Sequence, residues 1–418
     1  MGSLPKAEVI RVLIAGGCYA GLSTALNLCD LMDGLSPRMS RGLVEGSTDA
    51  PKLDIQITIV DERDGFFHVI GSPLALADAE YAKKAWVKFS DIPALLRPNI
   101  RIIQGSVMTV DCDNKSATIQ DNIIKETTTH GYDYFVAATG LRRVWPVVPQ
   151  SLTRKQYLLE AEEHIHAVAN SPEGVVVVGG GAVGIEMAAE LKLVKPHVKV
   201  TLVHSRDKLL SSEDLSDECK DRALDLLRES GVEVLMGHRL AETKELDTVS
   251  GRKRYEVEFT NGHKILANEV IMAISKSVPT TSYLPTSALD AEGYVKILPN
   301  LSFDSASPNA SSHFCGGDAA RWSGIKRCGA AMHHGFCIGN NIHQSIVRDL
   351  TGQAPKFQEM GEVAPMIGLA VGKKAVASGP EGTVYGEDVM QSYFRDDLGF
   401  TICWDWMQLG GRKEALAA

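Results

Sequence analysis

The amino-acid sequence predicts an α/β protein that contains two Rossmann-like dinucleotide-binding domains. Short runs of β-branched residues alternate with longer helical patterns along the chain, which is typical of α/β architecture. Two apolar runs end in glycine-rich loops, "VLIAGGCYAG" at residues 12–21 and "VVVVGGGAVG" at residues 175–184. The order of strand, helix, meander and strand after the first loop recurs after the second. The chain therefore repeats a whole domain plan rather than a short unit.

The first domain plan starts with a strand at residues 10–15 and a helix at residues 22–32. Residues 34–54 are rich in Gly, Ser, Pro and charge, so a surface insertion is expected there. A second strand is expected at residues 55–60, with Asp61 at its carboxyl end. A buried run without alternation is typical of a strand in a parallel sheet.

The remaining elements follow the same pattern. Residues 99–120 predict an antiparallel meander, which leads into a buried strand within residues 132–140. A helix near residues 160–170 connects to the second glycine loop. The second plan then has its own meander at residues 254–270 and a closing strand at residues 270–275.

Composition narrows the class of function. The 418 residues are 44% hydrophobic and 23% charged, as in ordinary globular proteins of two or three domains. The formal net charge of -9 argues against binding to a nucleic-acid backbone. This net charge is compatible with a local basic site that binds a small anion.

Targeting and cysteine patterns point to a reducing compartment. No apolar run approaches the roughly 20 residues that span a bilayer, and the first residues lack a signal-peptide pattern, so a cytoplasmic protein is expected. The 8 cysteines include no C-x-x-C pair, which predicts free thiols and no zinc knuckle. His333 and His334 are adjacent and cannot share a helix face, so no metal site is predicted.

The second glycine loop meets every position of the dinucleotide motif G-x-G-x-x-G. It lies between four valines and a helical run, where helix amides point toward a bound pyrophosphate. The alternative is glycine-rich packing without a ligand. The nucleotide-binding residues predicted in this loop and its helix are Gly179, Gly181, Ala182, Val183, Gly184 and Glu186.

The end of the next strand bears on which dinucleotide is bound. An acidic residue there is typical of NAD sites, whereas arginine is typical of NADP sites. Here the chain reads His204-Ser205-Arg206, so His204 and Arg206 are predicted to contact the nucleotide and NADPH is favoured over NADH. In the alternative interpretation, Arg206 is a solvated loop residue paired with Asp207.

The first loop is a weaker match, because Cys18 stands where the middle glycine is expected. Asp61, at the end of the following strand, suits the ribose of an adenosine. Cys18 is small enough for a close backbone approach to survive if its side chain turns away; the alternative is a degenerate loop without a ligand. The predicted contacts are Gly16, Gly17, Cys18, Ala20, Gly21 and Asp61.

A third motif lies near the carboxyl end of the chain. In "HFCGGDAARW", residues 313–322, Gly317 and Asp318 follow an apolar approach. This Asp is suited to accept hydrogen bonds from a polyol while nearby amides face a diphosphate. The first loop, the turn Ala138-Thr139-Gly140, the second loop, the "MAIS" turn at residues 272–275 and this motif occur in a consistent order.

In that order the chain resembles the flavoproteins with two dinucleotide-binding domains, which have the glutathione-reductase-like fold. It is most similar to the apoptosis-inducing-factor-like group that includes ferroptosis suppressor protein 1 and is related to type II NADH dehydrogenases. The stretches "VTLVHSRDKLL" and "FFHVIGSPLALA" resemble its fungal-type members. The departures are Cys18 in the first loop and Ser275 in the "MAIS" turn.

The resemblance implies non-covalent FAD and a pyridine nucleotide as cofactors. It places Gly16, Gly21, Asp61, Thr139, Gly140 and Asp318 at the FAD, and Gly179, Gly181, Gly184 and Arg206 at NAD(P)H. It also directs Glu186 toward the nicotinamide amide. It does not extend to the disulfide reductases, because residues 22–100 contain only Cys29, nor to Baeyer–Villiger monooxygenases, whose motif is missing.

Three further segments receive predictions. His68 lines the flavin-ring pocket or, alternatively, is a structurally satisfied loop histidine. Residues 326–341 predict a helix whose amino end faces the flavin. The aromatic tail at residues 400–411 is expected to pack on the flavin domain; contact with a membrane surface or burial in a dimer are the alternatives.

The predicted organisation is an FAD-binding domain split between residues 1–143 and 284–355, an NAD(P)H-binding domain at residues 144–283, and a C-terminal segment at residues 356–418. The expected reaction is hydride transfer from NAD(P)H to FAD, and then electron transfer to a small-molecule acceptor, either a quinone or an aromatic metabolite. The alternatives are a flavin-dependent oxidase or dehydrogenase of an organic metabolite, and an interaction protein that senses NAD(P)H.

Overall fold

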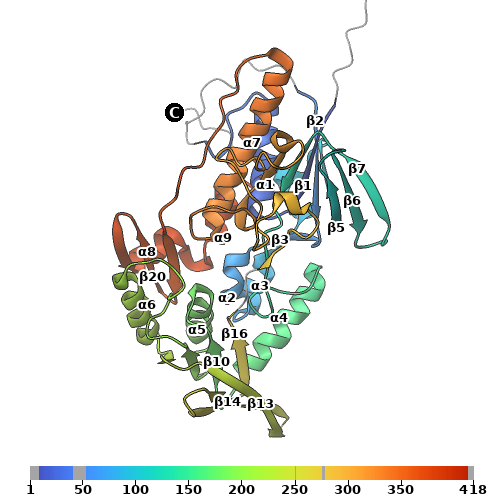
Figure 1. Cartoon of the computed structure of the whole chain (residues 1–418). Helices are drawn as coiled ribbons and strands as arrows, with labels where there is room; N and C mark the ends of the chain where they lie inside the picture. Colours follow the sequence, from blue (N-terminus) through green and yellow to red (C-terminus); the bar gives the residue numbers. More distant parts are fainter. Residues whose placement is uncertain (1–8, 41–52, 250, 275–277, 413–418) are drawn as a thin grey trace, which may run out of the picture.

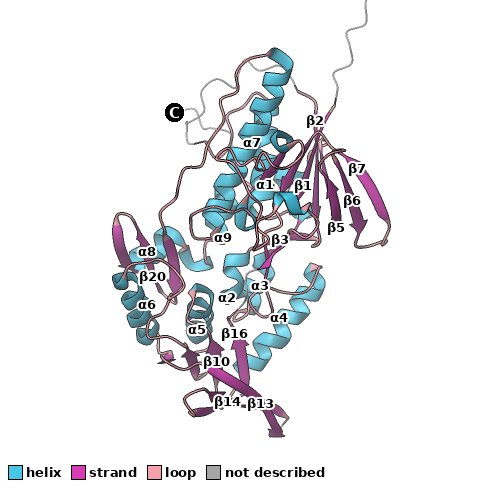
Figure 2. Cartoon of the chain, viewed as in Figure 1, coloured by secondary structure: helices cyan, strands magenta, loops and turns pink. Residues whose placement is uncertain are grey.

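The computed structural model describes residues 9–40, 53–249, 251–274 and 278–412. It confirms the predicted α/β class, with two mainly parallel sheets and their covering helices (Figures 1 and 2). The first sheet lies in one half of the molecule and the second in the other. The C-terminal elements lie beside the second sheet and return to the helices of the first (Figure 1).

The first sheet is parallel over five strands and antiparallel over its last two. In spatial order its strands are β18 (His313–Cys315), β8 (Tyr134–Ala137), β1 (Ile10–Ala15), β2 (Ile55–Asp61), β5 (Ile100–Asp111), β6 (Ser116–Asp121) and β7 (Thr127–Gly131). β18 is remote in sequence yet completes this sheet. The exact domain boundaries stay a prediction.

Two long helices, α1 (Tyr19–Met32) and α7 (Cys328–Thr351), pack side by side on one face of the first sheet (Figure 1). Small residues permit this close contact: a Cβ at Gly335 would overlap the backbone of Ala20. α7 is capped at its carboxyl end by Gly352, whose φ of 72° is a left-handed conformation that favours glycine. The contact fixes the amino ends of both helices at the carboxyl edge of the sheet.

The second sheet is wholly parallel, and the valine run is one of its two inner strands. Its strands are β12 (Glu233–Leu235), β11 (Val200–Val203), β10 (Val175–Val178) and β16 (Glu269–Met272), covered by α5 (Ala182–Val194) and α6 (Asp217–Glu229). A separate antiparallel meander consists of β13 (Leu240–Val249), β14 (Arg252–Phe259) and β15 (Lys264–Ala267).

Two strand pairs and three helices lie outside the two main sheets. They are the strand pairs β3 (Gly65–Phe67) with β4 (Trp86–Lys88) and β9 (Leu141–Arg142) with β17 (Val278–Pro279), and the helices α2 (Ser72–Ala75), α3 (Ala79–Ala85) and α4 (Arg154–Ala169). The C-terminal part adds β19 (Ile367–Val371), β20 (Lys374–Gly379), β21 (Gly382–Gly386), α8 (Glu387–Tyr393) and α9 (Phe400–Trp406).

The C-terminal part packs on both halves of the molecule. Leu369 and Val376 join the core formed by α5 and α6, whereas Phe400, Cys403 and Met407 join the core of α1 and α7. The prediction that the aromatic tail packs on the first domain is therefore confirmed. The sequence did not predict the attachment to the second half.

Two predicted elements differ from the structure. Helix α4 begins at Arg154, before residue 160, because Thr153 caps it by accepting from the Gln156 N–H. The segment after α1 was predicted as a surface insertion, but Met39 is buried and Arg38 forms an ion pair with the buried Asp30. Most of that insertion, residues 41–52, lies outside the described residues.

Candidate active site: two glycine loops on one cavity

A cavity of ≈ 960 Å³ lies where the two halves of the molecule meet. Its wall includes the first loop at Gly17, the later motif at Asp318 and the second loop at Gly181. Because parallel strands of both sheets end here, the cavity occupies the position where α/β folds place their ligands. Both predicted nucleotide sites therefore open on the same space.

The first loop has the geometry of a dinucleotide turn. Gly16 has φ of 107°, and a Cβ at Gly21 would overlap the Gly16 carbonyl oxygen, so both positions require glycine. The Gly17 N–H donates to Asp61 Oδ2 at 2.7 Å, which fixes the loop on the end of β2. Burial raises the pKa of the Asp61 carboxyl, and the Gly17 N–H opposes that rise.

Cys18 turns its side chain toward β3 and away from the loop. Its Sγ lies 3.6 Å from the carbonyl oxygen of Phe67, and burial raises the pKa of the thiol to about 12. The side chain is therefore a neutral thiol that leaves the backbone of the loop open to a ligand. This orientation is the one that the first-loop prediction required.

The strand-end turn and the later motif lie beside the first loop. Thr139 Oγ1 donates to the Thr280 carbonyl oxygen, and Gly140 lines the cavity next to it. The Gly317 N–H donates to His334 Nδ1 at 3.1 Å. Asp318 faces the cavity 3.4 Å from the Arg143 guanidinium. The structure thus brings the predicted flavin residues of four separate segments together.

The second loop repeats the first one, with one space left open. A Cβ at Gly184 would overlap the Gly179 carbonyl oxygen, whereas a Cβ at Gly181 would meet nothing within 4 Å. Gly181 has φ of -81° and ψ of 176°, so its backbone does not need glycine. The open space lies at the amino end of α5, and helix amino ends are positions where proteins commonly bind phosphate groups. Ala182 and Val183 also line the cavity.

His204 takes the structural place of Asp61 in the second half. The Gly180 N–H donates to His204 Nδ1 at 3.1 Å, just as the Gly17 N–H donates to Asp61. Burial lowers the pKa of His204, and the accepting Nδ1 requires the neutral ring. The end of β11 therefore carries no carboxylate that would repel a 2′-phosphate.

Arg206 lies at the exposed rim of this loop and does not line the cavity. Its guanidinium donates to Ser211 Oγ at 3.0 Å, and no ion pair joins it to Asp207 in the part of the chain that the structure describes. The guanidinium keeps most of its donors available for an anion.

Glu186 lines the cavity from α5. Its Oε1 accepts from the Ala370 N–H of β19 at 3.3 Å, and burial raises the pKa of its carboxyl to about 8. At neutral pH the carboxyl is protonated, so it offers both a donor and an acceptor. That pair of functions matches a carboxamide.

His68 lies behind the cavity wall. Its neighbours Phe67 and Val69 line the cavity, but the ring of His68 is fully buried between Tyr19 and the Leu398 carbonyl oxygen, at 3.0 Å from each. Burial lowers its pKa to about 4. The arrangement is that of the alternative interpretation, a structurally satisfied histidine.

Sequence reasoning missed several parts of the cavity. Arg63 and Arg327 line it, and the buried Nε of each has no partner among the described residues. Such donors suit a polar or anionic ligand. Ile367, Gly368 and Phe394 of the C-terminal part complete an apolar wall. The positions of the two arginines in the sequence, close to Asp61 and to the start of α7, could have indicated that they line the cavity. No local sequence pattern indicates the apolar residues.

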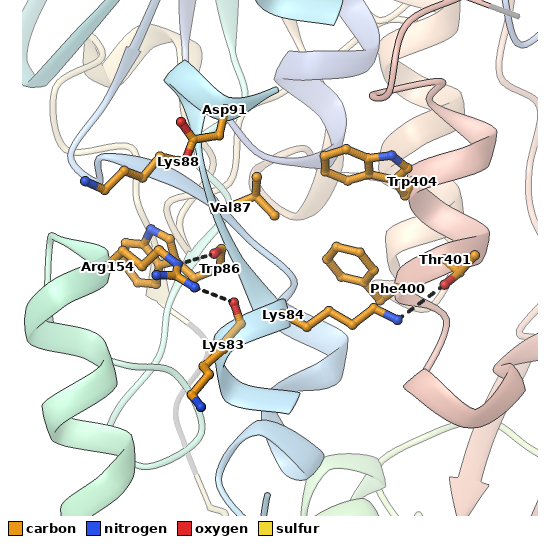
Figure 3. Close-up of a pocket in the computed structure, with 10 residues that line it drawn as sticks. All are labelled: Lys83, Lys84, Trp86, Val87, Lys88, Asp91, Arg154, Phe400, Thr401 and Trp404. Carbon is orange, nitrogen blue, oxygen red and sulfur yellow. Dashed lines mark hydrogen bonds between the residues drawn. The ribbon is translucent and has the colours of Figure 1, made fainter. Parts of the chain in front are cut away.

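A second, open pocket of ≈ 480 Å³ lies on the outer side of α9 (Figure 3). Figure 3 shows Phe400 and Trp404 of α9 facing Lys84 and Val87. Lys84 Nζ lies over the Phe400 ring at 5.1 Å and forms an ion pair with Asp397 at 2.6 Å. These contacts hold α9 against α3 and β4.

No group of three or more His, Cys, Asp or Glu side chains in the described ranges could hold a metal ion. None of the helices that the structure describes is both long enough and apolar enough to cross a membrane. Ser275, the departure in the "MAIS" turn, lies outside the described residues.

Two glycine loops that open on one cavity define the class as a dinucleotide-dependent oxidoreductase. The family model described as "Pyridine nucleotide-disulphide oxidoreductase" matches residues 10–335. The chain belongs to this family. Membership implies FAD and NAD(P)H as cofactors, and the glycine cradles and unpartnered arginine donors fit both.

Individual relatives confirm the predicted resemblance. Oxidoreductase OXR1 of Ajellomyces capsulatus is 51% identical, over 98% of this chain and 90% of that protein. Ferroptosis suppressor protein 1 of Mus musculus is 25% identical, over 85% of this chain and 87% of that protein. A solved structure, the NAD-dependent persulfide reductase from A. fulgidus, has a TM-score of 0.65 and 19% identity. It matches 92% of this chain, which spans 65% of that longer protein, and it supports the fold alone.

Proposed function

We propose that the protein transfers a hydride from NAD(P)H to FAD and then passes electrons to a quinone or a quinone-like aromatic acceptor. One observation carries the proposal: the two glycine loops and Asp318 border a single cavity. Nicotinamide and flavin rings bound from the two loops would therefore share one space. No side-chain nucleophile is required, because the cofactors supply the redox chemistry.

The residues of the first half are proposed to hold FAD, which supplies a hydride acceptor when bound. Asp61 suits the adenosine ribose, and Asp318 suits the polyol chain. Arg63 and Arg327 offer unpartnered Nε donors to the polar parts of the cofactor. The full proposed set is Gly16, Gly17, Cys18, Ala20, Gly21, Asp61, Thr139, Gly140, Gly317 and Asp318.

The residues of the second half are proposed to bind NAD(P)H. The helix α5 amides receive the pyrophosphate, and the protonated Glu186 orients the carboxamide. His204 holds the loop through the Gly180 N–H. The full proposed set is Gly179, Gly181, Ala182, Val183, Gly184, Glu186, His204 and Arg206.

The apolar wall of the cavity supports an aromatic acceptor. Ile367, Phe394 and Val147 face the same space as the loops, and they offer a surface for a planar ring. A cytoplasmic location is part of this proposal.

The decisive test is an anaerobic titration of the purified holoenzyme with NADPH and then NADH, in which the flavin absorbance is followed. Stoichiometric bleaching by either donor, followed by recovery on addition of a quinone, is the expected result. A flavin that stays oxidised with both donors would overturn the proposal and favour an organic substrate as the reductant.

Replacement of Arg206 by alanine tests the proposed preference for NADPH. A charge-assisted bond to a 2′-phosphate is worth about 1.5–3 kcal/mol, so the Kd for NADPH should rise roughly 10–100-fold while the Kd for NADH stays unchanged. Arg252→Ala, which removes an exposed arginine of β14, is the matched control. Equal losses for the two nucleotides would contradict the assignment of Arg206 to the 2′-phosphate.

A further inference from the structure

The amino end of α7 and the middle of α9 bring two cysteine sulfurs together. Cys328, the first residue of α7, lines the cavity, and its Sγ lies 4.0 Å from that of Cys403. Cys403 is only 3% exposed and lies behind Cys328. Both are free thiols. No other pair of cysteines in the described residues is in such contact.

The surroundings give the two thiols different roles. The contact with the Cys403 thiol, together with the Gly329 N–H, lowers the pKa of Cys328, and burial opposes this effect. The same contact raises the pKa of Cys403. Cys328 starts a 24-residue helix and follows Arg327 in the chain, a position that favours the nucleophilic thiolate form. Cys403, 4.0 Å away, is placed to resolve the oxidised form of Cys328.

We propose that Cys328 and Cys403 form a redox-active pair: a hydroperoxide that enters the cavity oxidises them to a disulfide, and the bound flavin returns them to thiols. The oxidation leg stands on the geometry of the pair. The reduction leg rests on the proposed function, because NAD(P)H must first reduce the flavin. The pair lies outside α1, where the sequence has only Cys29.

The steps balance in atoms and electrons. The Cys328 thiolate attacks a peroxide oxygen, the O–O bond breaks, and with one proton this gives a sulfenic acid and water or an alcohol. The Cys403 thiol then displaces water from that sulfenic acid and forms the S–S bond. Reduction takes two electrons and two protons, which NAD(P)H and one solvent proton supply, and regenerates both thiols.

Forming the Cys328–Cys403 disulfide requires only a small movement of the two sulfur atoms. A disulfide has an S–S length near 2.05 Å, so the sulfurs at 4.0 Å must approach by roughly 2 Å. α9 follows Gly399, whose φ is 79°, and Lys84 Nζ lies over the ring of its first residue, Phe400 (Figure 3). A small rotation of the two side chains with a shift of α9 closes the gap.

The first experiment maps disulfides in the holoenzyme after one equivalent of hydrogen peroxide. Free thiols are blocked under denaturing conditions, and tryptic peptides 328–348 and 396–412 should be recovered as a linked pair. Fragmentation must assign the link to Cys328 rather than Cys337, which lies on the same peptide. No linked pair, or a link from Cys18 instead, would overturn the proposal.

The second experiment counts reducing equivalents anaerobically. The peroxide-treated holoenzyme should consume two equivalents of NADPH before its flavin stays bleached, and Cys403→Ala whose Cys328 sulfenic acid has been capped with dimedone should consume one. Cys403→Ser is the second variant, in case alanine disturbs the packing of α9, and Cys112→Ala, at another buried cysteine, should behave as the wild type. In Cys403→Ala, dimedone should trap the sulfenic acid at Cys328.

The failures are distinguishable. If the linked peptide remains after the flavin is completely bleached, the flavin does not reduce the disulfide. That result overturns this step of the proposal and leaves the proposed function intact. If NADPH bleaches the flavin of neither the wild type nor Cys403→Ala, the proposed function is overturned, and the reduction of the disulfide by the flavin is overturned with it. The linked peptide would still support the oxidation of the pair by peroxide.

Discussion

Replacing Gly181 by valine should lower the rate of flavin reduction by NAD(P)H at subsaturating nucleotide about 100-fold or more, while the flavin stays bound. Such a loss corresponds to about 2.7 kcal/mol of binding free energy. The side chain would occupy the open space at the amino end of α5, where no protein atom lies within 4 Å. The backbone of Gly181 accepts a side chain, since its φ is -81°. The variant should therefore fold and lose the pyrophosphate site.

The measurements are stopped-flow flavin reduction, the flavin-to-protein absorbance ratio and thermal unfolding. Gly361→Val is the matched control, because that glycine is exposed and a Cβ there also meets nothing within 4 Å. Loss of the flavin together with nucleotide reduction would contradict separate sites. Unchanged reduction would contradict pyrophosphate binding at this loop.

Replacing Glu190 by glutamine should remove a large part of the pH dependence of stability. Glu190 is 1% exposed on α5, and burial raises the pKa of its carboxyl from the ordinary 4.5 to about 8. The Gly372 N–H donates to it, and its Oε1 has no partner among the described residues. The folded state thus keeps a proton that the unfolded chain releases above pH 4.5.

The sign follows from linkage. Between pH 4.5 and about 8 the folded protein binds more protons than the unfolded chain, so the free energy of unfolding falls as the pH rises. For this one group the fall is on the order of 3–5 kcal/mol across that interval. Glu186 contributes a second fall in the same direction, since its pKa is also raised to about 8.

Glutamine has the same shape and no proton to lose. Glu190→Gln should match the wild type near pH 5 and be more stable by several kcal/mol near pH 8.5, where the wild type carries a buried charge. Urea unfolding of the holoenzyme at both pH values measures the difference. Glu163→Gln, at an exposed position of α4, should show no such gain. Equal slopes for Glu190→Gln and wild type would contradict a raised pKa.

Local patterns were sufficient to predict most of the framework. The strand at residues 10–15 and the valine strand have the predicted bounds, because uninterrupted apolar runs that end at glycine leave few alternatives. Gly21 and Gly184 were predictable for the same reason: each lies where a side chain would overlap the carbonyl oxygen of the first loop glycine. Spacing alone encodes that constraint.

Partners distant in sequence were beyond such patterns. The contact of His204 with the nucleotide stays a prediction, and the structure adds that His204 accepts from the Gly180 N–H, as Asp61 accepts from the Gly17 N–H in the other half. Of the two interpretations of His68, the structure shows the satisfied loop histidine, because contacts with Tyr19 and Leu398 hold it behind the wall. Neither outcome has a local signal, because each depends on which segment packs nearby.

The sequence by itself determined that this chain has two glycine-loop domains of one plan, since β-branched runs, turn glycines and strand-end residues act over a few positions. Only the tertiary structure decided that both loops open on one cavity, that the C-terminal part closes its wall, and that Cys328 meets Cys403 across 75 positions of chain. The physical reason is that packing and burial join residues by proximity in space, which no pattern along the chain records.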